Sequence, residues 1–143
     1  MRLVVTIHLA AALAALAATL PAAAKDAKQT TEAAPEEVRR SLFSGSESRL
    51  AELGWISLDC TPSTPEVRML KPPGHGNTRF EEAVTAVSGD LTPLQRQCHG
   101  KPIYAVRVFY KANEDFSGAD VFSIDVDTKI GFVKRYTFTV DVR

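Results

Sequence analysis

Two alternating stretches on either side of a turn constrain the fold of this chain more than any other feature. The turn-rich break covers residues 111–118. The apolar positions are Tyr104, Val106, Val108 and Tyr110 before the break, and Phe122, Ile124 and Val126 after it. Alternation with polar or small residues at a period of two is typical of strands that bury one face. The stretch therefore predicts a β fold, and it predicts no reaction.

Shorter segments of the same kind predict the remaining strands. We expect them near Leu50 and Leu53 and at residues 56–60, 67–70, 77–87 and 136–142. Residues 77–87 fit neither the strand nor the helix period cleanly, and a helix over Glu81-Glu82-Ala83 is the alternative to the strand that we predict. About seven short strands in about 100 residues indicate an all-β, immunoglobulin-like Greek-key sandwich.

The N-terminal residues have the features of a secretory signal peptide. Arg2 precedes an almost wholly apolar run at residues 3–20, and the segment 21–24 ends in small residues that a signal peptidase accepts. We expect cleavage after Ala24, although a run of this length is also compatible with a retained membrane anchor. The sequence thus predicts a periplasmic or secreted protein without membrane association after cleavage. The first cysteine, Cys60, lies too far downstream for a lipid anchor at the cleavage site.

The residues after the predicted cleavage site are poor in groups that build a core. Residues 25–37 contain no aromatic and no β-branched aliphatic side chain, so burial cannot offset their ordering entropy. We predict a flexible leader at residues 25–45, with a short helical turn at residues 36–43 as the alternative. The sandwich domain is then expected at residues 46–143.

The opening stretch also resembles a known pattern. Bacterial cadherin-like and immunoglobulin-like repeats carry the form V-x-Y-x-x-x-x-x-F-x-G-x-D-x-F-x-x-x-V, which is occupied here by Val108, Tyr110, Phe116, Gly118, Asp120, Phe122 and Val126. A proline that often follows the tyrosine in such repeats is replaced by Lys111-Ala112. The resemblance implies a scaffold for recognition and no catalytic residue.

The same residues have a physical interpretation beside the resemblance. Gly118 can adopt a positive φ, and the carboxylate of Asp120 can accept hydrogen bonds from nearby backbone amides. Phe116 is placed to plug the end of the core between them. We expect these residues to let the chain cross from one sheet to the other.

Cys60 and Cys98 are the only cysteines, and both lie in the part of the chain expected to be exported. Oxidation is the normal fate of such a pair, so we predict a disulfide. It would hold the irregular segment 88–102 against the end of the predicted strand at residues 56–60. A redox-active pair is disfavoured because the C-x-x-C spacing is absent.

Two metal hypotheses follow from the polar residues. His75, His99 and Cys98, with Met69 available, suggest copper or zinc, but the ligand spacing of such sites is missing and the disulfide competes for the cysteine. Calcium is suggested by Asn113, Glu114, Asp115, Asp120, Asp125 and Asp127. The simpler interpretation is a polar strand face, because Asp125 and Asp127 point to the same side of one strand. We therefore expect no metal and no cofactor.

The remaining evidence favours binding over catalysis. Catalytic motifs such as G-x-S-x-G and H-E-x-x-H are absent, so we expect no enzyme. The 17 basic and 17 acidic side chains balance, which argues against nucleic acid. We expect an exported binding or structural module for an envelope protein or a glycan, with Trp55 as the possible anchor on the polar face, unless other segments cover it. The alternative is a periplasmic metal-binding or enzyme-accessory protein that uses His75 and His99.

Overall fold

The computed structural model describes residues 34–143, so the predicted signal peptide at residues 1–24 and the first part of the predicted leader lie outside the described residues. The described part contains seven strands and one short 3-10 helix, η1. Their bounds are β1 Glu36–Leu42, β2 Glu47–Gly54, β3 Glu66–Lys71, β4 Gly76–Ala86, η1 Arg96–Cys98, β5 Pro102–Ala112, β6 Gly118–Asp127 and β7 Val133–Val142. Within these residues no helix is long and apolar enough to cross a membrane.

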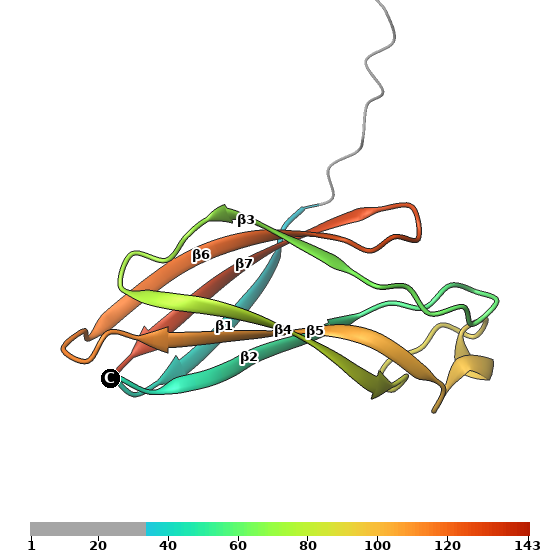
Figure 1. Ribbon diagram of the computed structural model, residues 1–143, viewed down its shortest axis with the longest axis horizontal. Helices are drawn as coiled ribbons and strands as arrows, with labels where there is room; N and C mark the ends of the chain where they lie inside the picture. Colours follow the sequence, from blue (N-terminus) through green and yellow to red (C-terminus); the bar gives the residue numbers. More distant parts are fainter. Residues whose placement is uncertain (1–33) are drawn as a thin grey trace, which may run out of the picture. The chain divides into compact units, whose positions relative to one another are not determined.

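The strands form two sheets that pack face to face (Figure 1). One sheet has the order β1-β7-β6-β3 and the other the order β2-β5-β4. The grouping of β3, β6 and β7 in one sheet and of β2, β5 and β4 in the other is that of an immunoglobulin-type Greek key. The first strand lies parallel to the last, from Glu36 opposite Tyr136 to Leu42 opposite Val142. The predicted fold class, a β-sandwich of about seven strands, is confirmed.

The first strand corrects the prediction of a flexible leader up to residue 45. Residues 36–42 are neither leader nor helical turn but form β1, so the folded domain begins before residue 46. Only Val38 and Leu42 of this strand contact the core. An edge strand that buries so few side chains needs little apolar sequence, because its register is fixed by backbone pairing with β7.

A second correction concerns residues 56–60, which do not form a strand. Ile56 makes an isolated bridge to Pro62, and the segment between them turns back on itself, with the amide of Cys60 donating to the carbonyl of Ser57 at 3.0 Å. Cys60 has a φ of 66°, which is incompatible with an extended strand. Leu58, which a strand here would place on the same face as the buried Ile56, is 57% exposed. The predicted alternation here arose from apolar residues of a turn.

The uncertain segment at residues 77–87 is a strand, as predicted. All eleven residues of β4 pair with β5 in one continuous antiparallel register, from Gly76 opposite Ala112 to Ala86 opposite Pro102. None of these residues is buried. The weak periodicity therefore reflects a strand at the edge of its sheet rather than a helix.

The main core lies between the sheets and is built on aromatic rings. Tyr110 of β5 stacks on Phe122 of β6 with ring centroids 6.0 Å apart, and Phe122 stacks on Phe138 of β7 at 4.7 Å. All three side chains are fully buried. Because Tyr110 belongs to one sheet and the two phenylalanines to the other, this stack ties the two layers of the sandwich together.

The crossing from β5 to β6 is organised by the carboxylate of Asp120. It accepts hydrogen bonds from the amides of Gly74 at 2.9 Å, His75 at 2.8 Å and Val121 at 2.9 Å, and from the Tyr110 hydroxyl at 2.8 Å. Burial raises the pKa of Asp120, but these four donors outweigh it and leave the pKa below its usual value. Burial and the bond to Asp120 raise the pKa of Tyr110.

The other two residues of the predicted crossing have the expected geometry. Gly118 has a φ of +132°, which L side chains rarely adopt. Phe116 packs against the main core and stacks on His75 with ring centroids 4.0 Å apart. Together with Asp120 they join the β5–β6 crossing to the β3–β4 turn at one end of the sandwich.

Candidate functional site

The predicted disulfide is present and joins two loops. Cys60, in the turn after β2, is bonded to Cys98 at the end of η1, with a sulfur–sulfur distance of 2.02 Å. Cys98 is completely buried. The bond therefore fixes the irregular segment between β4 and β5, which has no sheet ladder of its own, to the β2–β3 connection.

A second, smaller apolar core surrounds this disulfide. It consists of Ile56, Val87, Cys98 and Ile103, with Leu91 packed beside it. In β5, Ile103 points to the opposite face from Val106 and Val108, which belong to the face that meets the other sheet. The disulfide thus holds a cap on the outer face of the β2-β5-β4 sheet.

Three loops at this end of the domain border an open depression of about 560 Å³, which we call the loop-end cavity. It is lined by Ile56, Ser57, Leu58, Asp59, Gln95, Ile130 and Phe132. These residues come from the β2–β3 connection, the loop before η1 and the β6–β7 hairpin, which gather at the right-hand end of Figure 1. Leu58 is 57% exposed and Phe132 48% exposed. The cavity therefore presents large apolar side chains to solvent.

Hydrogen bonds set the shape of the cavity wall. The side-chain amide of Gln97 donates to the carbonyl of Leu58 at 2.9 Å and so links the η1 loop to the β2–β3 connection. On the opposite side, the buried Thr128 hydroxyl donates to the carbonyl of Phe132 at 2.7 Å. The loops that carry Leu58 and Phe132 are thus fixed by contacts outside the cavity itself.

Asp59 supplies a negative charge at the rim. Its carboxylate accepts hydrogen bonds from the Ser57 hydroxyl and from the amide of Thr61 at 3.1 Å. These bonds, that of Ser57 foremost, lower the pKa of Asp59. The rim is therefore anionic at neutral pH.

Trp55, predicted as a possible exposed anchor, is only partly exposed and packs against the main core. Its carbonyl accepts a hydrogen bond from the Ser63 hydroxyl at 3.3 Å. The alternation that placed Trp55 on a polar face was wrong because residues 56–60 are not a strand. The exposed apolar residues lie farther along, at Leu58 and Phe132.

The histidine pair proposed for a metal is split between the two ends of one ladder. His75 lies at the start of the β4–β5 ladder, where its carbonyl accepts a hydrogen bond from the amide of Asn113 beside the Gly76–Ala112 pair. His99 lies at the other end, in the loop before the Ala86–Pro102 pair. The ladder between them spans about 30 Å at the usual rise of a strand. Cys98 is bound in the disulfide, so it offers no thiolate to copper.

Three of the carboxylates considered for calcium, those of Asp120, Asp125 and Asp127, are engaged elsewhere. Asp120 is bound by backbone amides, and Asp127 forms an ion pair with Lys129 at 2.8 Å. Asp125 is not on a solvated face as expected: it is buried, and it bonds Arg68 at 2.9 Å and Arg135 at 2.8 Å from the two neighbouring strands. Within residues 34–143, no three His, Cys, Asp or Glu side chains are grouped to share a metal ion.

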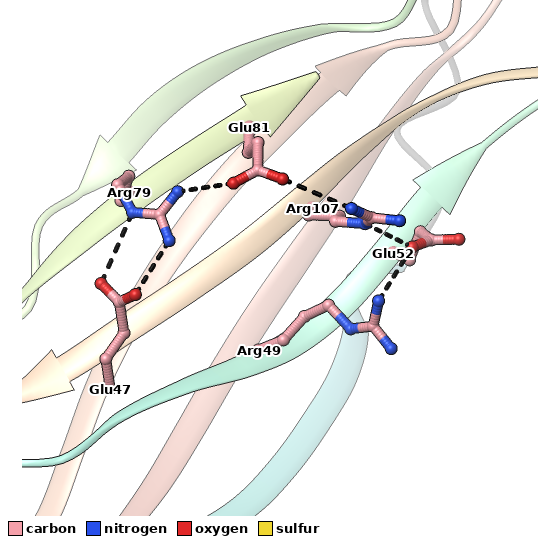
Figure 2. A network of polar contacts seen from close by, with 6 residues as sticks. All are labelled: Glu47, Arg49, Glu52, Arg79, Glu81 and Arg107. Atoms are coloured by element: carbon pink, nitrogen blue, oxygen red, sulfur yellow. Dashed lines mark hydrogen bonds and ion pairs between the residues drawn. The ribbon is translucent and has the colours of Figure 1, made fainter. Parts of the chain in front are cut away.

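The outer face of the β2-β5-β4 sheet carries a continuous charged network (Figure 2). Arg79 of β4 bonds Glu47 of β2 and Glu81 of β4, both at 2.8 Å. Arg107 of the central strand extends the network from Glu81 at 3.3 Å to Glu52 at 2.8 Å, which also contacts Arg49. Opposite charges alternate across the three strands, so this face is polar and internally neutralised.

No protein-family model matches this sequence, and no curated protein matches it either. The resemblance to cadherin-like repeats therefore stays a prediction. Sequence reasoning missed Phe132 and Gln95 as surface residues. The only signal was the apolar pair Phe132-Val133 directly after Gly131, which is unusual at the end of a hairpin turn.

Proposed function

We propose that this protein is a recognition module that binds a protein partner through the loop-end cavity. The observation that carries the proposal is the exposure of Leu58 and Phe132 in a depression of about 560 Å³, two of whose three bordering segments are joined by a disulfide. Exposed apolar side chains that line a concave surface are a common mark of protein interaction sites.

The rigid frame of the cavity supports this proposal. Loops that need not be ordered on binding cost less entropy, so a pre-formed cavity binds more tightly than flexible loops with the same side chains. The disulfide and the Gln97 bond to Leu58 supply this rigidity. Loop ends of immunoglobulin-type sandwiches are also a frequent place for recognition, which is an argument by analogy with other sandwiches.

The chemistry of the cavity defines the partner that we expect. Leu58, Ile130 and Phe132 suit an apolar side chain, and the anionic rim at Asp59 suits a lysine or arginine beside it. The proposed ligand is therefore a protein segment with an apolar residue next to a basic one. A glycan is less well matched, because the one aromatic residue that lines the cavity is a phenylalanine, with aliphatic side chains around it and few planar polar groups for hydrogen bonds to sugar hydroxyls.

Export is part of the proposal. The disulfide joins Cys60 to Cys98, which is completely buried. Structural disulfides of this kind persist in oxidising compartments. A binding role outside the cytosol needs no cofactor and no catalytic residue. We therefore keep the prediction of an exported, non-enzymatic module.

Panning of a random peptide library against the immobilised protein tests this function. We expect enrichment of peptides with an apolar residue beside a lysine or arginine, and loss of their binding on Phe132→Ser or Leu58→Ser. Asp59→Asn should weaken only the peptides that carry the basic residue. The matched control is Val121→Ser, an exposed apolar residue on β6, which should leave binding unchanged.

The outcomes that contradict the proposal are specific. Enrichment of no peptide class, or of peptides that bind Phe132→Ser as well as the unchanged protein, would overturn it. Binding to a glycan array that depends on Phe132 would replace the protein partner by a carbohydrate. Thermal unfolding of each variant ensures that lost binding is not lost folding.

A further inference from the structure

β4 offers an unpaired edge in the described domain. It is the outer strand of the β2-β5-β4 sheet, so the backbone groups on its far side have no strand partner within residues 34–143. The strand is eleven residues long and pairs with β5 without a bulge. It contains no proline and no lysine. Long regular edges of this kind pair readily with another strand.

The other three edges carry the devices that prevent such pairing. β2 has a bulge between Arg49 and Ala51, and its Leu50 carbonyl accepts a hydrogen bond from Arg40 of β1 at 3.1 Å. β3 is shorter, has a bulge between Met69 and Lys71, and is followed by two prolines. β1 is seven residues long and carries adjacent arginines. β4 also carries charges, with Glu82 on its inner face, but it is the longest of the four edge strands and, unlike β2 and β3, has no bulge.

The two faces of β4 differ in chemistry. Arg79 and Glu81 pair with Phe109 and Arg107 of β5 and lie on the outer, charged face of the sheet. Phe80 pairs with Val108, so it lies on the face that meets the other sheet, although it is 36% exposed. Two antiparallel strands that continue a sheet place residues of the same face opposite each other. This rule limits the registers in which β4 can pair with a second β4.

Three registers give long overlaps, and charge distinguishes them. The overlap of residues 76–86 places Glu81 opposite Glu81 of the other copy, and the overlap of residues 78–86 places Glu82 opposite Glu82. The overlap of residues 76–84 places Phe80 opposite Phe80 on the two-fold axis. Arg79 of each copy then faces Glu81 of the other, twice by symmetry. Only this third register replaces like charges by two opposite-charge pairs and one apolar contact.

We propose that two copies of this chain associate through antiparallel pairing of their β4 edges, with Phe80 on the two-fold axis and reciprocal Arg79–Glu81 pairs. The result is one continuous six-stranded sheet, in which the charged network of Figure 2 extends from one copy into the other. The interface is isologous and uses up both free edges, so it closes at two copies. The loop-end cavity is built from other segments, so this proposal does not depend on the proposed function.

Charge reversal tests the register by sedimentation equilibrium. Arg79→Glu places glutamates opposite each other twice, and Glu81→Arg places arginines opposite each other twice. Each variant alone should dimerise about tenfold or more weakly than the unchanged protein. An equimolar mixture of the two variants should regain the dimer, because both pairs are then of opposite charge. Phe80→Lys should abolish the dimer by placing two lysines on the axis.

The controls are Arg49→Glu and Glu52→Arg on the β2 edge, which alter the same network from the far edge of the sheet. Glu52 also bonds Thr85 of β4, so Arg49→Glu is the cleaner of the two. They should leave the dimer constant unchanged, and circular dichroism should show every variant folded. A protein that stays monomeric up to its solubility limit would overturn the proposal. So would a mixture of Arg79→Glu and Glu81→Arg that remains monomeric, or β2 variants that weaken the dimer equally.

Discussion

Removal of the Asp120 carboxylate is the sharpest test of how the sandwich is held together. The side chain is 4% exposed and accepts four hydrogen bonds, one of them from the fully buried hydroxyl of Tyr110. Asp120→Ala leaves these donors without their acceptor, at about 1–3 kcal/mol for each donor that water cannot reach. Because Gly74 and His75 are exposed and their amides can recover water, we expect a total loss of about 3–5 kcal/mol.

Urea unfolding followed by the fluorescence of Trp55, the only tryptophan, measures this loss. Tyr110→Phe removes a single hydrogen bond to a charged group and should cost about 1.5–3 kcal/mol. Asp115→Ala, an exposed aspartate of the preceding turn, is the matched control and should change stability by less than about 0.5 kcal/mol. If Asp120→Ala costs no more than the control, the carboxylate does not organise the crossing.

The same experiment at acid pH has a predictable outcome, because the pKa of Asp120 is lowered in the folded protein. The pKa of Asp120 is lower in the folded protein than in the unfolded chain, where it is about 3.9. Its contribution is therefore fully present above that unfolded value and is lost as the pH falls through the lower folded value. The difference in free energy of unfolding between the unchanged protein and Asp120→Ala should shrink with acidification in that range. A difference that grows below pH 4 would refute the reasoning.

Three further predictions address other contacts. Replacement of Cys60 and Cys98 by serine should lower the free energy of unfolding by about 4 kcal/mol in the chain-entropy model, as measured in urea, and an unchanged midpoint would contradict it. Gly76→Ala places a Cβ 2.5 Å from the carbonyl oxygen of Lys111 and should lower the free energy of unfolding by about 2 kcal/mol or more. Gly74→Ala, where the nearest atom is 3.6 Å away, should be nearly neutral. Equal melting temperatures of the two variants would refute this. Removal of the charge at the centre of the outer-face network, by Arg107→Gln, should lower the free energy of unfolding at low salt and lower it less at about 1 M salt. A loss that salt does not reduce would rule out an electrostatic origin.

The strands that the sequence predicted well are those with one deeply buried face. Phe122, Ile124 and Val126 of β6 are all fully buried, so their alternation is a direct record of the packing. β1 shows no such alternation, because it lies at the edge of its sheet and only Val38 and Leu42 of this strand pack against the core. Its place is set by pairing with β7, a long-range contact that no local pattern encodes.

The errors at residues 56–60 have a different origin. Ile56 belongs to the small core around the disulfide, and Leu58 is exposed beside it, so an apolar pattern arose without a strand. The disulfide could be predicted from two cysteines, but the second core that it encloses could not, since its members are spread from residue 56 to residue 103. Asp125 was misplaced because arginines from two neighbouring strands cover it.

The loop-end cavity was beyond sequence reasoning for the same reason. Leu58, Gln95 and Phe132 come from three separate connections, and only the folded domain brings them to one depression. The sequence offered Trp55 as a possible anchor, with cover by other segments as the alternative, and the side chain is partly covered and packs against the main core.

Nuclear magnetic resonance of the labelled protein with a peptide selected by panning tests the central claim most directly. The account predicts that the backbone amide shifts of Leu58, Gln95 and Phe132 change on titration and saturate together, while those of Arg79 and Glu81 on β4 do not change. Shift changes confined to β4 or to the β1-β7-β6-β3 sheet, with none at the loop-end cavity, would contradict it.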